Sequence, residues 1–343
     1  MFSSLNLWSV LGRRPYQTLP PVYRELDVPS INNNHHDKEL ISMVKFIVPT
    51  LSYGLHKGQC GRIAVVGGCQ EYTGAPYFAA ISALKVGADL SHVFCTADSA
   101  PVIKSYSPEL IVHPLLDKSS ALEEIGLWLP KMHSVVVGPG LGRHGPLLST
   151  VKDVLAKTIS LKLPLVIDAD GVYLLSQDPD VIRNYTPAIL TPNVVEFSGL
   201  YQKVIGRKPE VDHPVNNVKT LAEELGNVTI VLKGAYDIVS DGKEVLICNT
   251  EGSPRRCGGQ GDLLSGSMGT FNHWSHLKTT GVNETTCNHN KLLAIYGPTL
   301  CAAYAACALT RECSQQAFKK CNRSMTTSDL IAEVCNVFHK LYE

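Results

Sequence analysis

A cluster of three glycines, one glutamine and one aspartate occupies residues 258–262, directly before an apolar run. Glycine-rich backbone at the start of a helix presents unpaired N–H groups and the positive end of the helix dipole, a combination that binds phosphate. No Lys-Ser or Lys-Thr pair follows, so the stretch is not a P-loop. Asp262 could take a proton from a hydroxyl that attacks the phosphate, or it could cap the helix. The residues alone favour neither role.

Three further stretches could serve the same chemistry. Asn193 and Glu196 stand three residues apart, a spacing that predicts either a capping box or a polar pair that orients water or Mg²⁺ beside phosphates. Lys233 could reach a phosphate as a point charge, although an ordinary surface lysine would give the same pattern. The run GPGLG at residues 138–142 is, taken alone, a plain tight turn.

Weaker candidates complete the set. Arg255 and Arg256 either face a phosphate or lie free at the surface. Asp168 and Asp170 could face a metal ion, but a helix cap is the preferred interpretation of Asp170. The run YTGAP at residues 72–76 could hold a flat heterocycle, or it could simply begin a helix with its proline in the first turn.

These stretches need structural elements that bring them together. Short β-rich runs alternate with glycine or polar turns and with helical segments, which is the α/β pattern with a mainly parallel sheet. The strands are apolar at consecutive positions, as expected when helices cover both faces. Because ligands bind beyond the carboxyl ends of such strands, the polar stretches should converge there. The expected strands are residues 62–66, 90–95, 134–137, 165–167, 188–190 and 228–232.

The sheet is expected to end differently. Asp241-Gly242 lies between β-rich runs at 236–240 and 244–248, which predicts a hairpin and a late antiparallel edge. We see no internal repeat and no linker after residue 45, so one catalytic domain over residues 41–343 is expected. The expected helices are residues 76–86, 146–159, a segment through Leu174, the alanine-rich 291–310 and the amphipathic 328–341.

The composition excludes several classes of protein. The 343 residues are 44% hydrophobic and 18% charged, enough for a substantial core and unlike a disordered chain. Basic and acidic residues number 31 each, so neither nucleic acid nor a membrane is an expected partner. We find no run of about 18 apolar residues and expect no transmembrane helix. Eleven cysteines without CxxC spacing indicate buried free thiols in a reducing compartment.

The N-terminal part differs from the rest. Residues 1–23 contain Arg13, Arg14 and several hydroxyl residues but no acidic residue. This composition predicts a mitochondrial transit peptide, with an irregular N-terminus on a cytoplasmic protein as the alternative. Residues 24–40 are expected to be a polar tether, so that 1–40 form an N-terminal extension. The segment 279–288, with a glycosylation sequon at Asn283, is expected to be an inserted loop whose sequon goes unused in a reducing compartment.

Seven runs occur in a fixed order: YTGAP, GPGLGR, IDADG, LTPNVVEFSGL, VLKGAYD, GSPRRCGGQGDLLSG and SMTTSDL. Together they resemble the ATP-dependent NAD(P)H-hydrate dehydratase family, whose members have a ribokinase-like fold. The resemblance covers about residues 40–343, and the combination is specific although no single run is. The expected fold is therefore ribokinase-like α/β: a central, mainly parallel β-sheet flanked by helices on both faces, with a late β-hairpin.

The resemblance implies the repair of damaged NADH and NADPH. Their hydrates carry a hydroxyl on C6, which ATP with Mg²⁺ would phosphorylate, and loss of phosphate would restore NADH or NADPH. Asp262 would be the catalytic base that deprotonates this hydroxyl, while the backbone of Gly259, Gln260 and Gly261 would bind the transferring phosphate. Phosphorylation turns a poor leaving group into a good one, which explains a kinase-like site in a dehydratase.

The resemblance also implies which residues bind each substrate. Asp262 and residues of two loops would bind NAD(P)H hydrate: Gly140, Gly142, Asn193, Val194, Val195, Glu196, Phe197, Ser198 and Gly199. Two segments would bind ATP: Lys233, Gly234, Ala235, Tyr236 and Asp237, then Gly252, Ser253, Pro254, Arg255, Arg256, Cys257, Gly258, Gly259, Gln260 and Gly261. Glu196 would help to hold Mg²⁺ indirectly, through water.

One departure bears on the choice of reaction. Relatives with kinase activity usually carry Gly-Ala-Gly-Asp where this chain has Gln260 in place of the alanine. This difference favours the dehydratase over the alternative, a kinase that acts on a hydroxymethyl heterocycle. No epimerase domain is evident, so a separate NAD(P)H-hydrate epimerase is expected to supply the S epimer. The sequence is compatible with ATP or ADP as phosphate donor, with either hydrate as the preferred substrate, and with a homo-oligomer.

Overall fold

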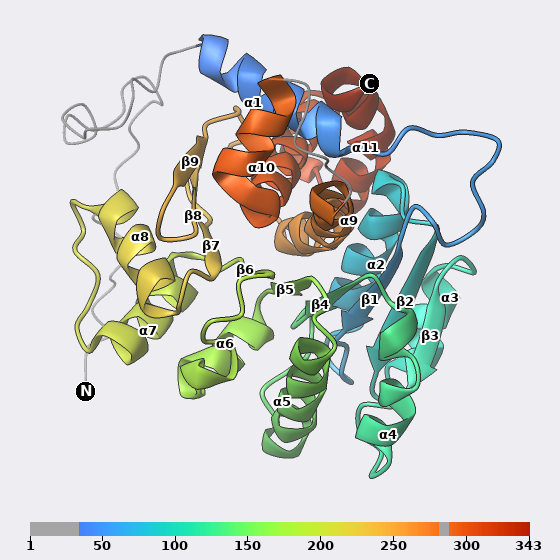
Figure 1. The fold of residues 1–343 in the computed structure, drawn as a ribbon. Coiled ribbons are helices and arrows are strands. Elements are labelled where there is room, and N and C mark those ends of the chain that lie inside the picture. The colour runs from blue at the N-terminus through green and yellow to red at the C-terminus, as the bar shows by residue number, and fades with distance from the viewer. Residues whose placement is uncertain (1–33, 281–287) are drawn as a thin grey trace, which may run out of the picture. The chain divides into compact units, whose positions relative to one another are not determined.

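The computed structural model describes residues 34–280 and 288–343. The described residues form one nine-stranded sheet in the order β3-β2-β1-β4-β5-β6-β7-β8-β9 (Figure 1). All neighbours from β3 to β7 pair in parallel, whereas β7–β8 and β8–β9 are antiparallel. The strands are β1 (Arg62–Val66), β2 (Leu90–Cys95), β3 (Ile111–Pro114), β4 (Ser134–Val137), β5 (Leu165–Ile167), β6 (Ala188–Leu190), β7 (Thr229–Leu232), β8 (Asp237–Ser240) and β9 (Val245–Cys248).

Helices cover both faces of this sheet (Figure 1). Along β1, Ile63 and Val65 pack into one core while Ala64 and Val66 pack into the other, which is why the strand is apolar at every position. The first core includes α1 (Asn34–Ile47), α2 (Gly74–Val86), α3 (Ala100–Tyr106), α9 (Gln260–Thr280), α10 (Asn288–Cys321) and α11 (Thr327–Tyr342). The second includes α4 (Ala121–Gly126), α5 (Gly145–Ser160), α6 (Asp170–Gln177), α7 (Val194–Ile205) and α8 (Pro214–Glu224). The predicted α/β class is confirmed.

The antiparallel edge is larger than predicted. The hairpin around Asp241-Gly242 joins β8 to β9 as expected, and a second reversal at residues 233–236 makes β7 and β8 antiparallel as well. The sequence analysis also missed the edge strand β3, which pairs with β2. This strand has one exposed residue, Ile111, and a partly exposed His113, so it lacks the continuous apolar run that identifies a central strand.

The helix α1 corrects the expectation of a polar tether over residues 24–40. It begins at Asn34, so the last part of that stretch is helical. Leu40, Val44 and Ile47 recur at helical spacing and are at most 1% exposed, because this face packs into the core with α10 and α11. Residues 1–33, including the predicted presequence, lie outside the described residues.

The alanine-rich helix α10 is longer than the predicted 291–310 and runs from Asn288 to Cys321. Gly297, with φ 72° and ψ 173°, interrupts it immediately before Pro298. No helix long and apolar enough to cross a membrane is expected from the sequence, but the segment Leu293–Ser324 passes that test by length and composition. In the fold, 67% of the most apolar stretch of this segment is buried. Of the predicted inserted loop, residues 281–287 with Asn283 lie outside the described part of the chain.

Three thiols of α10 are buried and form no disulfide, as predicted, but the prediction of buried thiols is wrong for Cys335, which is exposed, and for Cys257 and Cys321, which are only partly buried. Cys301, Cys307 and Cys313 are each 0% exposed and form no disulfide. Burial in the core raises the pKa of all three thiols above the ordinary value, so they stay protonated at neutral pH. They fill space in the core like small apolar side chains.

Close packing of α9 against α2 fixes the start of α9 in space. A Cβ built on Gly266 would lie 2.0 Å from the carbonyl oxygen of Ala79 in α2. One turn further on, the Thr270 hydroxyl donates to the carbonyl of Ala83 at 3.2 Å. Only glycine permits this approach of two helix backbones.

We predict that Gly266→Ala lowers the free energy of unfolding by about 1–3 kcal/mol, the cost of forcing extra atoms into a packed interior. The measurement is urea denaturation with linear extrapolation. Gly145→Ala is the matched control, since a Cβ at Gly145 would meet nothing within 4 Å. Equal stability of the two variants would contradict this account of the α9–α2 contact.

Candidate active site

Polar side chains meet at the carboxyl edge of the parallel strands. Lys233, which follows β7, places its Nζ 2.9 Å from Oδ1 of Asp168, which follows β5. The Thr191 hydroxyl, after β6, donates to the same oxygen at 2.8 Å. The Asp168 side chain is 2% exposed, so the ion pair is shielded from water. The predicted convergence of strand ends is therefore present, and Lys233 is not a free surface lysine.

The glycine cluster lies directly against this ion pair. A Cβ built on Gly261 would lie 3.5 Å from Lys233 Nζ and 3.6 Å from Asp168 Oδ2. Gly259 has φ +96°, and a Cβ there would strike the Thr327 hydroxyl at 2.7 Å. Glycine is thus required at Gly259, for its backbone conformation and for lack of space, whereas a Cβ at Gly261 would make only ordinary van der Waals contact with the charged pair. The cluster leads into α9, whose N-terminus presents unpaired N–H groups.

Asp262 is the third residue of α9, which begins at Gln260. The carbonyl of Gly259 accepts the amide of Leu263 at 3.0 Å, so Asp262 lies inside the first turn and is not the N-cap. Burial, followed by the nearby Asp168 carboxylate, raises the pKa of Asp262 to about 7, although the Lys233 ammonium opposes the rise. A carboxylate with a pKa near neutrality is suited to accept a proton at physiological pH.

Asn193 and Glu196 form the capping box that their spacing allowed. The Asn193 side chain accepts the amides of Val195 and Glu196 at 2.9 and 3.0 Å, and Glu196 Oε2 accepts the Asn193 amide at 2.8 Å. Burial is the main reason that the pKa of Glu196 is raised. The box fixes the Glu196 carboxylate close to the Lys233 charge and still leaves Oε1 for another partner.

The GPGLG loop wraps around the same edge. A Cβ built on Gly138 would lie 1.8 Å from the backbone oxygen of Asp168, so the loop lies against the strand end that carries the ion pair. Asp170 accepts the Gly142 amide and Arg143 Nε, each at 2.9 Å. The expectation that Asp170 caps α6 is wrong: Ala169, with φ 48°, holds the cap position and makes no side-chain cap bond.

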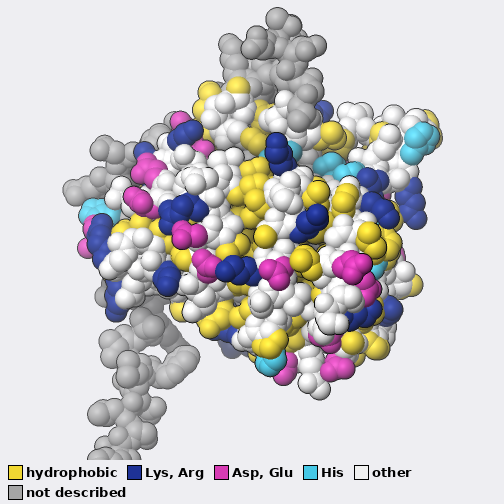
Figure 2. All heavy atoms as spheres, turned by 60° about the horizontal axis from the view of Figure 1, so that its bottom comes forward, with side chains coloured by type: hydrophobic (Ala, Val, Ile, Leu, Met, Phe, Trp, Pro, Cys, Tyr) yellow, Lys and Arg dark blue, Asp and Glu magenta, His cyan; other side chains and the backbone are white. Residues whose placement is uncertain are grey.

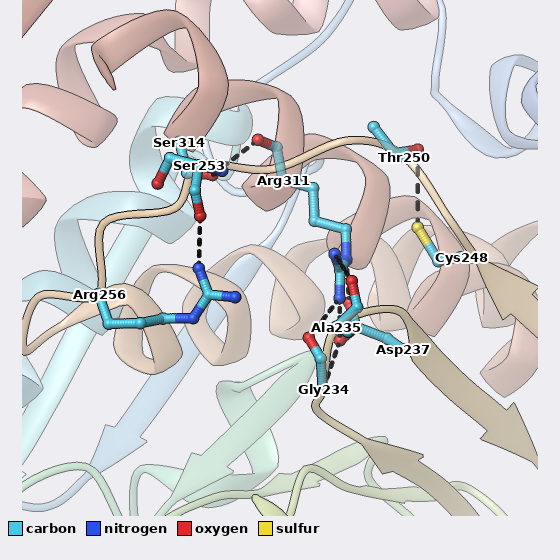
Figure 3. Close-up of polar contacts among 9 residues, drawn as sticks. All are labelled: Gly234, Ala235, Asp237, Cys248, Thr250, Ser253, Arg256, Arg311 and Ser314. Atoms are coloured by element: carbon cyan, nitrogen blue, oxygen red, sulfur yellow. Dashed lines mark hydrogen bonds and ion pairs between the residues drawn. The ribbon is translucent and has the colours of Figure 1, made fainter. Parts of the chain in front are cut away.

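The two segments predicted to bind ATP are held by the C-terminal helices. Figure 3 shows Arg311 of α10 reaching the turn at Gly234–Asp237, and Ser314 meeting Ser253. From α11, the Thr327 hydroxyl donates to the carbonyl of Gly258 at 2.6 Å. The sequence alone predicts no role for Arg311, Ser314 or Thr327. The available signal for Arg311 is that it is the first charged residue after the uncharged run 292–310.

Comparison with known proteins identifies the family. A family model described as NAD(P)H-hydrate dehydratase matches residues 63–336. The chain belongs to the NAD(P)H-hydrate dehydratase family. It is 54% identical over 317 residues to the ATP-dependent (S)-NAD(P)H-hydrate dehydratase of Homo sapiens, a match covering 92% of this chain and 88% of the relative.

Solved structures agree on the fold of this NAD(P)H-hydrate dehydratase family member. A ribokinase-like superfamily protein from Enterococcus faecalis matches with a TM-score of 0.69 and 20% identity, covering 88% of this chain and 94% of the other. An ADP/ATP-dependent NAD(P)H-hydrate dehydratase from Bacillus subtilis, co-crystallized with ATP/Mg²⁺, matches with a TM-score of 0.62 and 18% identity over 88% and 97% of the two chains. The ribokinase-like fold is confirmed.

Residues 193–199, which are predicted to bind the hydrate in this family member, include both exposed and buried side chains. Val194 and Val195, at the start of α7, are 62% and 81% exposed. Phe197 is 3% exposed and packs on Tyr201 in the core, with ring centroids 5.6 Å apart. Its side chain therefore supports α7 from inside, and any contact from Phe197 to a ligand is through the backbone.

The carboxylates suit a magnesium ion carried by phosphates. Within residues 34–280 and 288–343, no three His, Cys, Asp or Glu side chains are grouped to hold a metal ion. Mg²⁺ typically takes one or two carboxylates together with phosphate oxygens and water. Glu196, with one oxygen outside the capping box, fits that partial role better than a metal cage built from protein alone.

A cavity of about 530 Å³ lies elsewhere. Its lining includes Cys60, just before β1, and Gly87, between α2 and β2. It therefore opens at the amino edge of the sheet, at the opposite end of the strands from the candidate active site. No residue predicted for that site lines it. Figure 2 shows another view, in which Lys/Arg and Asp/Glu side chains are interspersed over the visible face.

Proposed function

We propose that this protein uses ATP to dehydrate the S epimers of NADH hydrate and NADPH hydrate, which restores NADH and NADPH. The observation that carries the proposal is Asp262, a carboxylate of raised pKa held at a glycine-rich helix start beside the Lys233–Asp168 pair. The relative from Homo sapiens is named ATP-dependent (S)-NAD(P)H-hydrate dehydratase, which describes this activity. The same arrangement suits phosphoryl transfer to a hydroxyl, which is the first half of the reaction.

In the first step, Asp262 accepts the proton of the C6 hydroxyl as its oxygen attacks the γ-phosphorus of ATP. A new O–P bond forms on the hydrate, the bond from the γ-phosphorus to the bridging oxygen breaks, and ADP leaves. Backbone N–H groups of Gly259–Gly261 and the Lys233 ammonium stabilise the charge on the transferring group. Mg²⁺ bound to the phosphates beside Glu196 would neutralise part of that charge.

In the second step, the C6–O bond breaks and phosphate leaves with the bonding electron pair. The lone pair of the ring nitrogen assists this departure, and a proton is lost from the adjacent C5. The C5=C6 double bond forms again, so that hydrate and ATP give NADH, ADP, phosphate and a proton released to solvent.

The deciding experiment incubates the protein with ATP, Mg²⁺ and purified NADH hydrate. We expect recovery of the absorbance of reduced nicotinamide, with one ADP formed for each NADH. A stable phosphorylated product without NADH would instead support a kinase for hydroxymethyl heterocycles. Parallel reactions with ADP, and with NADPH hydrate, identify the phosphate donor and the preferred substrate.

We predict a pH dependence that reports the ionisation of Asp262. Because the base must be deprotonated and its pKa is raised to about 7, kcat/KM should rise with pH and level off above neutrality. The measurement is initial rate at subsaturating hydrate across a pH series. A rate that is flat from pH 5 to 8 would contradict Asp262 as the titrating base.

The proposed cellular setting rests on the composition of residues 1–23, which contain Arg13 and Arg14 but no acidic residue. A separate NAD(P)H-hydrate epimerase would supply the S epimer, and we propose that both enzymes act in mitochondria. Fractionation of cells that express a C-terminally tagged protein, followed by N-terminal sequencing of the recovered form, tests the location. Recovery of an uncleaved chain in the cytosol would contradict it.

A further inference from the structure

The turn between β7 and β8 lacks sheet partners of its own. The ladder of the two strands closes at Leu232 and Ile238, so the intervening backbone must find other partners if it is to stay ordered. Within the turn, Gly234 donates its amide to Asp237 Oδ1 at 3.2 Å. The carbonyls of Gly234 and Ala235 are satisfied from outside the turn.

Arg311 of α10 supplies those outside bonds. Its Nε and Nη2 donate to the two carboxylate oxygens of Asp237 at 2.6 and 2.7 Å, its Nη1 donates to the Ala235 carbonyl at 2.8 Å, and its Nη2 donates to the Gly234 carbonyl at 2.9 Å (Figure 3). The side chains of Arg311 and Asp237 are 12% and 8% exposed. Only the rigid fork of a guanidinium can bind a carboxylate with two bonds and two carbonyls at once.

The same part of α10, through Ser314, also holds the second predicted ATP-binding segment, residues 252–261. Ser314 Oγ accepts the Ser253 amide at 3.1 Å and donates to the Arg311 carbonyl at 2.8 Å. A Cβ built on Gly252 would lie 3.3 Å from Ser314 Oγ. Arg256 then donates to the Ser253 carbonyl at 2.5 Å and so folds the loop back on itself (Figure 3).

We infer that Arg311 is the positioning residue of the nucleotide site: it holds the first ATP-binding segment, Ser314 on the same helix holds the second, and the two segments are thereby kept at a fixed separation. The inference rests on the proposed function only in taking these segments as the ATP site. Arg311 uses its donors on protein acceptors, so it acts through the turn and not on the phosphates. Its loss should weaken the binding of ATP and leave the binding of NADH hydrate unchanged.

The test measures ATP affinity directly, by calorimetry with Mg²⁺ and ATP on the full chain. Arg311→Lys keeps the positive charge but cannot reproduce the fork, and we expect about tenfold weaker ATP binding from the misplaced turn. Ser314→Ala leaves no buried charge unpaired, so it should weaken ATP binding by a smaller factor. Arg323→Lys, at an exposed arginine just beyond α10, is the matched control.

Two further readouts separate positioning from general stability and from the proposed reaction. For Arg311→Lys we expect a raised KM for ATP with an unchanged KM for NADH hydrate, and a thermal midpoint close to that of the parent. Unchanged ATP affinity in both variants, or a lower thermal midpoint without loss of affinity, would overturn the inference, as would failure of the parent to bind ATP. ATP binding by a parent that restores no NADH would instead count against the proposed function alone.

Discussion

Asp262→Asn should lower kcat by about 10²- to 10⁴-fold, the usual contribution of a general base, while ATP binding stays as tight or becomes tighter. The amide has the size of the carboxylate but cannot accept the C6 hydroxyl proton. It also removes a negative charge that repels the phosphates. The measurements are kcat from NADH recovery and ATP affinity from calorimetry. Asp153→Asn, at an exposed position on α5, is the matched control and should keep full activity.

The same variant should change stability in a pH-dependent way. The folded pKa of Asp262, about 7, lies above its ordinary value of 3.8, so folding disfavours the charged form. Stability is therefore lost as pH rises from the lower value to the upper one. Asp262→Asn escapes that loss and should melt at a higher temperature than the parent at pH 8 but not at pH 4. Retained turnover would remove Asp262 as the base, whatever the melting curves show.

Lys233→Met should reduce kcat/KM for ATP by about 10²- to 10³-fold, the range found when one donor to a developing charge is removed. It should also move the rising limb of the pH profile to higher pH. The Lys233 ammonium lowers the pKa of Asp262, so without it the base stays protonated to higher pH. Lys157→Met, at an exposed lysine of α5, is the control and should change neither quantity.

Asp168→Asn should move the same limb in the opposite direction. The Asp168 carboxylate raises the pKa of Asp262, so its neutral amide lets Asp262 ionise at lower pH. The hydrogen bond from the Thr191 hydroxyl can persist, because an amide oxygen also accepts a hydrogen bond from a hydroxyl. If Lys233→Met and Asp168→Asn shifted the rising part of the pH profile in the same direction, that part of the profile would report the ionisation of a group other than Asp262.

The central strands and their polar ends could be predicted from the sequence for a physical reason. Each parallel strand, such as β4 or β5, is buried on both faces and ends at glycine or a polar residue, so local composition identifies it. The convergence of Asp168 and Lys233 then follows from the geometry of a parallel sheet, whereas Asp262 reaches the same place through the start of α9. The edge strand β3 lacks that double burial and gave no such signal.

What could not be predicted depends on partners distant in the sequence. Asp170 has the composition of a helix cap, yet its carboxylate binds Gly142, 28 residues earlier. Arg311 binds Asp237 across 74 residues, and no local pattern indicates that pairing. Residues 34–40 look polar, but α1 is stabilised by contacts with α10 and α11, so propensity is overridden by packing.

The bond from Thr327 to Gly258 has a consequence for the order in which the protein is made. The sheet is complete at Cys248, but the loop that follows it is tied to α10 at Ser253 and to α11 at Gly258. Because a chain emerges from the ribosome N-terminus first, all nine strands are synthesised before the helices that cover one face of the sheet and fasten the nucleotide loop. A nascent chain would therefore acquire its catalytic competence last, and a chain stopped before Thr327 would keep every strand yet lack the tie that closes the loop.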